Sequence, residues 1–213
     1  MIFREIKITN QKPVKAEIPE SWDDVTFKQL NALMNDDDTL SRLSILTNIP
    51  KHYFSKYPEL ADFYVWVESK LEWANKWDED NSDVETFMLK DGVFNFPKDI
   101  GMLSVGLYKD IQSEVQENKD DILSTYPLIC ASYYQIIKDG EYDYIKAKEY
   151  ISMFDDQPCK AVWNAAGFFL SKVESLKNGT KRGVRGRVIQ VIKRWLALIG
   201  FRKYSGLKLY PHS

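Results

Sequence analysis

The segment Ile18-Pro19-Glu20-Ser21-Trp22-Asp23-Asp24-Val25-Thr26-Phe27-Lys28-Gln29 contains the change from strand to helix on which the predicted fold depends. Pro19 has no backbone N–H to donate to a neighbouring strand, so it ends the strand that precedes it. Ser21 and the two aspartates offer side-chain oxygens that can cap the first free N–H groups of a helix. We therefore expect an amphipathic helix from Val25 onward.

The residues before this segment have the pattern of two strands. Apolar side chains alternate with polar ones from Ile2 to Ile8 and again from Val14 to Ile18, with polar residues 9–12 between the runs. A period of two is typical of strands with one buried face. These residues therefore predict a β-hairpin.

The same order of features recurs 78 residues later. Ile18-Pro19 matches Phe96-Pro97, and Val25-Thr26-Phe27 matches Leu103-Ser104-Val105. Lys90-Asp91-Gly92 stands between two apolar runs just before the second match, and Asp-Gly in that setting is a strong hairpin signal. A hairpin thus precedes both copies, which indicates an internal duplication.

The predicted fold class is mainly α with small β-hairpins (α+β), built from two duplicated hairpin-plus-helices units and a C-terminal basic helix. The units are residues 1–80 and 84–176, followed by a basic tail at 177–213. Apolar spacing predicts helices over residues 25–34, 40–46, 60–77, 104–111, 122–137, 144–154 and 158–176. The residues expected in the core are Trp22, Phe27, Leu30, Leu43, Phe63, Val67, Leu103, Tyr108, Leu128, Val162, Trp163 and Phe169.

Charge is distributed unevenly along the chain, although the net charge is only −2. Residues 175–213 contain ten basic residues and no acidic one, which leaves 19 basic and 31 acidic residues, a net charge of −12, in the first 174. An acidic body therefore carries a basic tail.

The sequence lacks the residue patterns of known enzyme and cofactor sites, so we expect no enzyme, no cofactor and no small-molecule substrate. His52, which is expected in a loop, and His212 have no Cys or His partner at a metal-ligand spacing. Cys130 and Cys159 are expected to be free, buried thiols. The acidic clusters, Asp36-Asp37-Asp38, Asp78-Glu79-Asp80 and Asp155-Asp156, lie at predicted helix ends, where aspartate caps N–H groups. No phosphate-binding or dinucleotide glycine motif occurs.

Hydrophobic patterning argues against a membrane protein and against a nucleic-acid stacking surface. No run approaches the roughly 18 apolar residues of a membrane span, and the first residues alternate where a signal peptide would be continuously apolar. We therefore expect no membrane span and a cytoplasmic protein. Aromatic residues make up 14% of the chain, and most of them fall on helical stripes, so they are expected to pack in the core.

The basic tail is the segment whose composition most requires a partner. Its glycines predict a flexible joint, and the apolar stripe from Val188 to Ile199 predicts a helix beyond it. That helix has four alternatives: docking on its own acidic body, contact with DNA, contact with an acidic neighbouring subunit, or adsorption to a membrane surface. The residues expected to bind the partner are Arg182, Arg185, Arg187, Lys193, Arg194, Trp195, Arg202 and Lys203.

Several segments, taken in order, resemble small proteins of tailed-bacteriophage morphogenesis clusters. The resemblance covers residues 14–175 and rests on the Ile18–Gln29 segment, on Lys90-Asp91-Gly92 leading to Phe96-Pro97, and on Tyr126-Pro127-Leu128. It implies a virion structural protein of the tail or the head-tail junction, or a tail assembly chaperone. The basic tail leaves a nucleic-acid-binding regulator as a third hypothesis.

For a virion protein, the partners implied are other virion proteins and copies of this chain, with the tail reaching DNA or an acidic subunit. Its expected locations are the host cytoplasm during assembly and then the virion. Leu107 stands where the first copy of the duplicated pattern has Gln29, and the resemblance contains no invariant functional motif. It therefore transfers no site residue to this chain.

Overall fold

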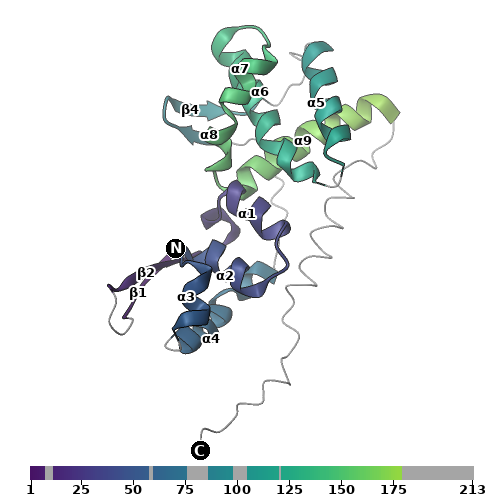
Figure 1. Cartoon of the computed structure of the whole chain (residues 1–213). Helices are drawn as coiled ribbons and strands as arrows, with labels where there is room; N and C mark the ends of the chain where they lie inside the picture. The colour runs from purple at the N-terminus through teal and green to yellow at the C-terminus, as the bar shows by residue number, and fades with distance from the viewer. Residues whose placement is uncertain (8–11, 58–59, 76–85, 98–104, 120, 179–213) are drawn as a thin grey trace, which may run out of the picture.

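The structure of the protein is a computed structural model that describes residues 1–7, 12–57, 60–75, 86–97, 105–119 and 121–178. Within these residues the chain is mainly helical, with two antiparallel two-stranded sheets (Figure 1). The predicted α+β class is therefore confirmed.

The first half of the chain begins with the predicted hairpin. Strand β1 (Ile2–Ile6) pairs with β2 (Val14–Ile18), and Ile2 lies opposite Ile18. The elements that follow are the 3-10 turn η1 (Trp22–Asp24), helices α1 (Phe27–Met34), α2 (Thr39–Thr47), α3 (Lys51–Lys56) and α4 (Leu60–Lys70), and the 3-10 turn η2 (Glu72–Asn75).

The second half repeats the order of a hairpin followed by helices. Strand β3 (Thr86–Leu89) pairs with β4 (Gly92–Asn95) through the predicted tight turn, in which Gly92 has a φ of 125°, a value that favours glycine. The elements that follow are α5 (Val105–Glu117), the 3-10 turn η4 (Ile122–Thr125), α6 (Tyr126–Asp139), α7 (Tyr144–Glu149), α8 (Ile151–Asp155) and α9 (Cys159–Asn178).

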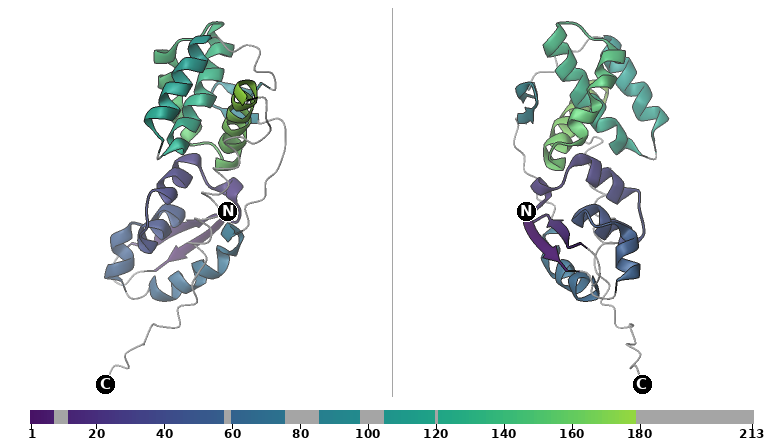
Figure 2. Two further views of the ribbon diagram at one scale, coloured as in Figure 1. Left: turned by 90° about the vertical axis from the view of Figure 1, so that its right-hand side faces the viewer. Right: turned by 60° about the vertical axis from the view of Figure 1, so that its left-hand side comes forward.

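Two hydrophobic cores divide the described residues. The smaller core lies between β1–β2 and α2–α4, where Ile18, Phe63 and Val67 are buried. The larger core is built around α6 and α9, and it also takes Trp22 and Phe27 from the first half of the chain. Figure 2 shows the two groups of helices one above the other, with α1 at their junction.

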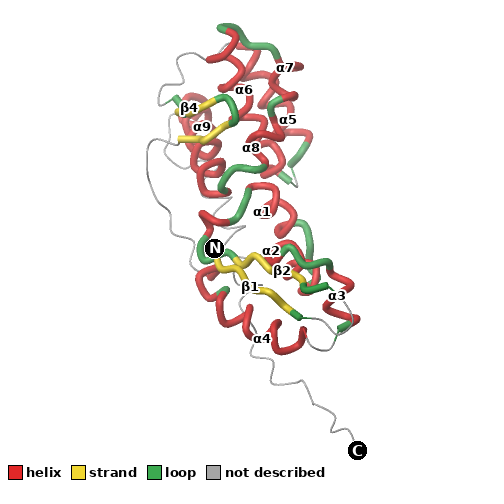
Figure 3. The backbone as a smooth tube through the Cα atoms, turned by 90° about the vertical axis from the view of Figure 1, so that its left-hand side faces the viewer, coloured by secondary structure: helices red, strands yellow, loops and turns green. Residues whose placement is uncertain are grey.

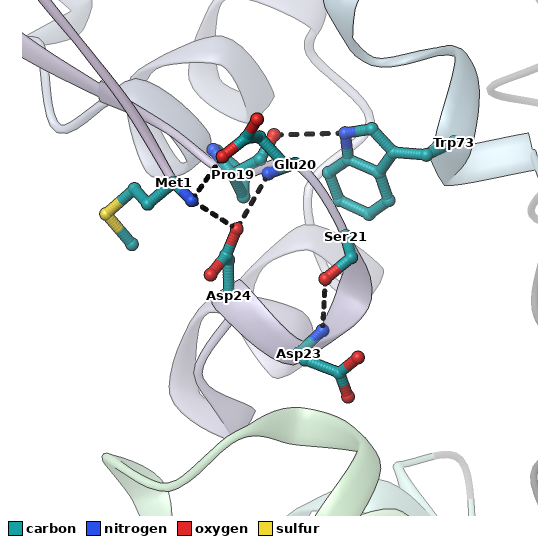
Figure 4. Close-up of polar contacts among 7 residues, drawn as sticks. All are labelled: Met1, Pro19, Glu20, Ser21, Asp23, Asp24 and Trp73. Carbon is teal, nitrogen blue, oxygen red and sulfur yellow. Dashed lines mark hydrogen bonds and ion pairs between the residues drawn. The ribbon is translucent and has the colours of Figure 1, made fainter.

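The residues after Pro19 join the two cores. The Trp22 ring meets Trp73 edge-on at 5.1 Å between ring centroids, and the Trp73 indole N–H donates to the Pro19 carbonyl over 3.0 Å (Figure 4). The Ser21 hydroxyl caps η1 by accepting from the Asp23 N–H over 3.2 Å. This segment therefore fixes the relation of the first hairpin to α1.

The polar side chains after Ser21 form hydrogen bonds and an ion pair with nearby residues. The Asp24 carboxylate accepts from the Glu20 N–H over 2.9 Å and lies 2.9 Å from the amino group of Met1 (Figure 4). The Thr26 hydroxyl accepts from the Gln29 N–H over 3.2 Å, while the Gln29 side chain accepts from the Thr26 N–H over 2.9 Å. This reciprocal capping box starts α1, so the cap of the predicted helix is Thr26 and not Ser21 or the two aspartates.

The start of α1 is bonded to the start of α9, far away in the sequence. The Phe27 N–H donates to the Gln157 carbonyl over 2.9 Å, and the Cys159 N–H donates to the Val25 carbonyl over 2.7 Å. The Cys159 thiol also donates to the Trp22 carbonyl over 3.0 Å. Cys130 and Cys159 are buried thiols that form no disulfide, as the sequence predicts.

The second strands and the helices after them keep the predicted 78-residue spacing. Strands β2 and β4 begin at Val14 and Gly92, and α1 and α5 begin at Phe27 and Val105. Burial differs between the copies, because Phe27 is fully buried and Val105 is 71% exposed. Residues 98–104 lie outside the described residues, so the duplication itself stays a prediction.

Three sequence predictions need correction. The helix expected over residues 60–77 ends at Lys70, because the chain tightens into η2 and brings Trp73 against Trp22. His52 lies in α3 rather than in a loop. The helix expected over residues 144–154 is divided at Tyr150 into α7 and α8.

Of the twelve predicted core residues, ten are buried. Leu103 lies outside the described residues, and Tyr108 is only half-buried. Helix α5 instead buries Leu107 and Ile111, which lie four residues apart on one face.

Candidate functional site

The residues predicted to bind a partner lie beyond the last described residue. Arg182, Arg185, Arg187, Lys193, Arg194, Trp195, Arg202 and Lys203 all fall within 179–213, as does His212. The candidate site described below therefore lies on the body, among residues that a positively charged, apolar segment could contact.

The described carboxylates serve mainly as helix caps and in ion pairs. The Asp38 carboxylate accepts from the Ser41 N–H over 2.7 Å and caps α2 as predicted. That hydrogen bond, with the Lys51 ammonium 3.1 Å away, holds the pKa of Asp38 below its usual value. Among the residues that the structure describes, no three His, Cys, Asp or Glu side chains group as a metal site would need.

Hairpin β3–β4 has two faces of different chemistry. On the inner face the cross-strand pair Phe87 and Phe94 is buried against Phe154 of α8, with ring centroids 5.2 and 6.1 Å from it. On the outer face the cross-strand pair Met88 and Val93 is 72% and 60% exposed. An apolar pair is thus presented to solvent on a hairpin anchored by aromatic packing.

A polar clamp holds the tip of the same hairpin. The Asp91 carboxylate accepts from the Tyr134 hydroxyl over 3.0 Å and from the Lys138 ammonium over 3.1 Å. The Lys138 ammonium also lies over the rings of Tyr134 and Tyr150, at 5.4 and 5.0 Å. Lys138, and then Tyr134, lower the pKa of Asp91, which therefore stays ionised at neutral pH. The clamp fixes the direction in which Met88 and Val93 point.

The residues that end α8 lie beside this hairpin, and two of them carry carboxylates. Asp155 and Asp156 are followed by Gln157, whose side-chain amide donates to the Met88 carbonyl over 3.4 Å. Burial and then the charge of Asp156 raise the pKa of Asp155, while Lys28 lowers it in part. Among the described lysines and arginines, none lies within the 4 Å of an ion pair with either carboxylate. We call Met88, Val93, Asp155 and Asp156 the hairpin surface.

The hairpin surface and the end of α9 lie on different sides of the molecule. Figure 1 shows β4 beside α8 on one side of the bundle, while α9 ends on the other. Figure 3 shows both hairpins on the same side of the molecule, β3–β4 beside the upper group of helices and β1–β2 beside the lower group.

No known protein family, curated protein or solved structure matches the chain.

A second polar cluster has a structural role. The Tyr144 hydroxyl donates to Glu114, and the Lys148 ammonium lies 3.0 Å from the same carboxylate. Tyr144, and then Glu114, raise the pKa of Lys148 to about 12. These bonds tie α5 to α7.

In the described residues, none of the helices is long and apolar enough to cross a membrane.

The hairpin surface was not predicted from the sequence, because apolar residues occur on both faces of the hairpin. Phe87-Met88-Leu89 and Val93-Phe94 do not alternate with polar residues. The register pairs Phe87 with Phe94 and Met88 with Val93, and it places one pair on each face. A hairpin with apolar residues on both faces, in an acidic chain, was the signal in the sequence that could have indicated this surface.

Proposed function

We propose that this protein is a structural component of a tailed-bacteriophage virion, located in the tail or at the head-tail junction, and that it acts by protein–protein assembly. Its partners are other virion proteins and copies of itself. It is made and assembled in the host cytoplasm and remains in the virion.

The observation that carries this proposal is the exposed pair Met88 and Val93 on an anchored hairpin. Exposed apolar pairs lose contact with water when a partner covers them, and a surface already fixed before binding loses little conformational entropy. Phe154 packing and the Asp91 clamp supply that fixation. The resemblance to morphogenesis proteins supports the phage setting.

The charge distribution supports assembly with several copies. The first 174 residues have a net charge of −12 and residues 175–213 have ten positive charges. Opposite charges on one chain allow each copy to attract the next, and they increase the rate of encounter at low salt.

Quantitative mass spectrometry of purified virus particles tests the proposal. The particles are compared with the unassembled fraction of the same infected cells, and a known virion protein serves as the reference for copy number. We expect the chain in the particles at a fixed ratio to that reference. A chain confined to the unassembled fraction would indicate the chaperone and overturn the virion assignment.

A further inference from the structure

We propose that residues 187–199 of one copy dock on the hairpin surface of the next copy, with apolar side chains on Met88 and Val93 and cations at Asp155 and Asp156. This head-to-tail contact rests on the proposed assembly function and names the partner surface for it.

The hairpin surface combines an apolar part with an acidic part. Met88 and Val93 stand opposite each other on adjacent strands, so their side chains form one patch on the outer face. The Gln157 amide joins the Met88 carbonyl to the chain segment that follows Asp155 and Asp156. A ligand that covers the patch can therefore place positive charge beside the two carboxylates.

Residues 187–199 have the complementary chemistry. Apolar residues recur at helical spacing between Val188 and Ile199, with cations at Arg187, Lys193 and Arg194 and no acidic residue. A basic segment offsets the charge of Asp156, which together with burial disfavours the ionised form of Asp155. The fit involves both charge and hydrophobic contact.

The position of α9 favours docking on a neighbour over docking on the same copy. Asp155 and Asp156 come just before α9, and the basic segment follows its other end, at Asn178. A helix of 20 residues is about 30 Å long. Residues 179–186 can span about 26–29 Å at most, at about 3.3–3.6 Å per residue, so they are too short to return along the whole helix.

Contact between opposite sides of successive copies is heterologous. Each copy then offers one donor segment and one acceptor surface, so the contact repeats until the rotation closes a ring or an open filament grows. The end of α9 and the hairpin surface lie on different sides of the molecule, as such repetition requires (Figure 1).

Photocrosslinking of the purified full chain tests the contact. The photoreactive amino acid benzoylphenylalanine replaces Met88 or, in a second variant, Val93, both of which are exposed. Val65 on α4, which is 65% exposed, receives the same substitution as the matched control. Mixing isotopically light and heavy protein separates crosslinks between copies from those within one copy.

We expect crosslinks from positions 88 and 93 to residues 187–199 of a different copy, at several times the yield from position 65. The double substitution Asp155→Asn/Asp156→Asn should lower that yield by a factor of about three or more, as should about 0.5 M salt. Asp37→Asn/Asp62→Asn removes the same charge from exposed carboxylates near the smaller core and should leave the yield unchanged.

Three results would overturn the inference: crosslinks to residues 187–199 only within one copy, yields equal to that of position 65, or crosslinks to another segment. The particle measurement is independent of this test. A chain found in particles but without the crosslink would keep the proposed function and reject this contact.

Discussion

Phe63 on α4 is the side chain whose loss should show most directly that the smaller core is correctly assigned. Its side chain is 4% exposed and its ring lies 5.9 Å from that of Trp66. Phe63→Ala should lower the free energy of unfolding by about 3–5 kcal/mol through lost burial and a residual cavity. Urea denaturation measures this, with Val65→Ala at an exposed position as control. A loss under about 1 kcal/mol would show that Phe63 is wrongly assigned to the smaller core.

Glu114 should contribute to stability in a pH-dependent way. The Tyr144 hydroxyl, and then the Lys148 ammonium, hold the pKa of Glu114 below its unfolded value of 4.5. Its contribution is therefore complete above pH 4.5 and is lost as the pH falls through the lower folded pKa. Glu114→Gln should reduce the loss of unfolding free energy between pH 6 and about 3. An unchanged pH profile in denaturant titrations would contradict the interaction.

Helix α1 depends on the capping box at its start. Thr26→Ala removes the oxygen that accepts from the Gln29 N–H and should cost about 1 kcal/mol. Thr26→Ser keeps that oxygen and should restore most of the stability. Equal unfolding midpoints for the Ala and Ser variants would mean that the cap contributes nothing measurable.

Element boundaries were predictable from the sequence where local residues determine them. Pro19, the Asp91-Gly92 turn and the Asp38 cap act through their own backbone, and each marks a boundary in the structure. The ends of α4 and α7 were missed because contacts with distant residues set them, such as that of Trp73 with Trp22. The exposure of Met88 depends on strand register, which the apolar run alone does not fix.

At the scale of the whole molecule, the sequence indicated the acidic body and basic tail but not the division into cores. Trp22 and Phe27 join the larger core because the start of α1 bonds to the start of α9, 132 residues from Phe27 at Cys159. No periodicity in the sequence reports a pairing over that separation. The hairpin surface likewise arises only once α8 and β3 are brought together.

Incorporation of a tail-less chain into particles tests the central claim, that body and basic segment act together in assembly. The full chain and a chain without residues 180–213 are supplied together in infected cells, after matching unfolding midpoints confirm that both bodies fold. We expect the truncated chain to enter purified particles several-fold less often than the full chain. Equal incorporation of the two chains would contradict it.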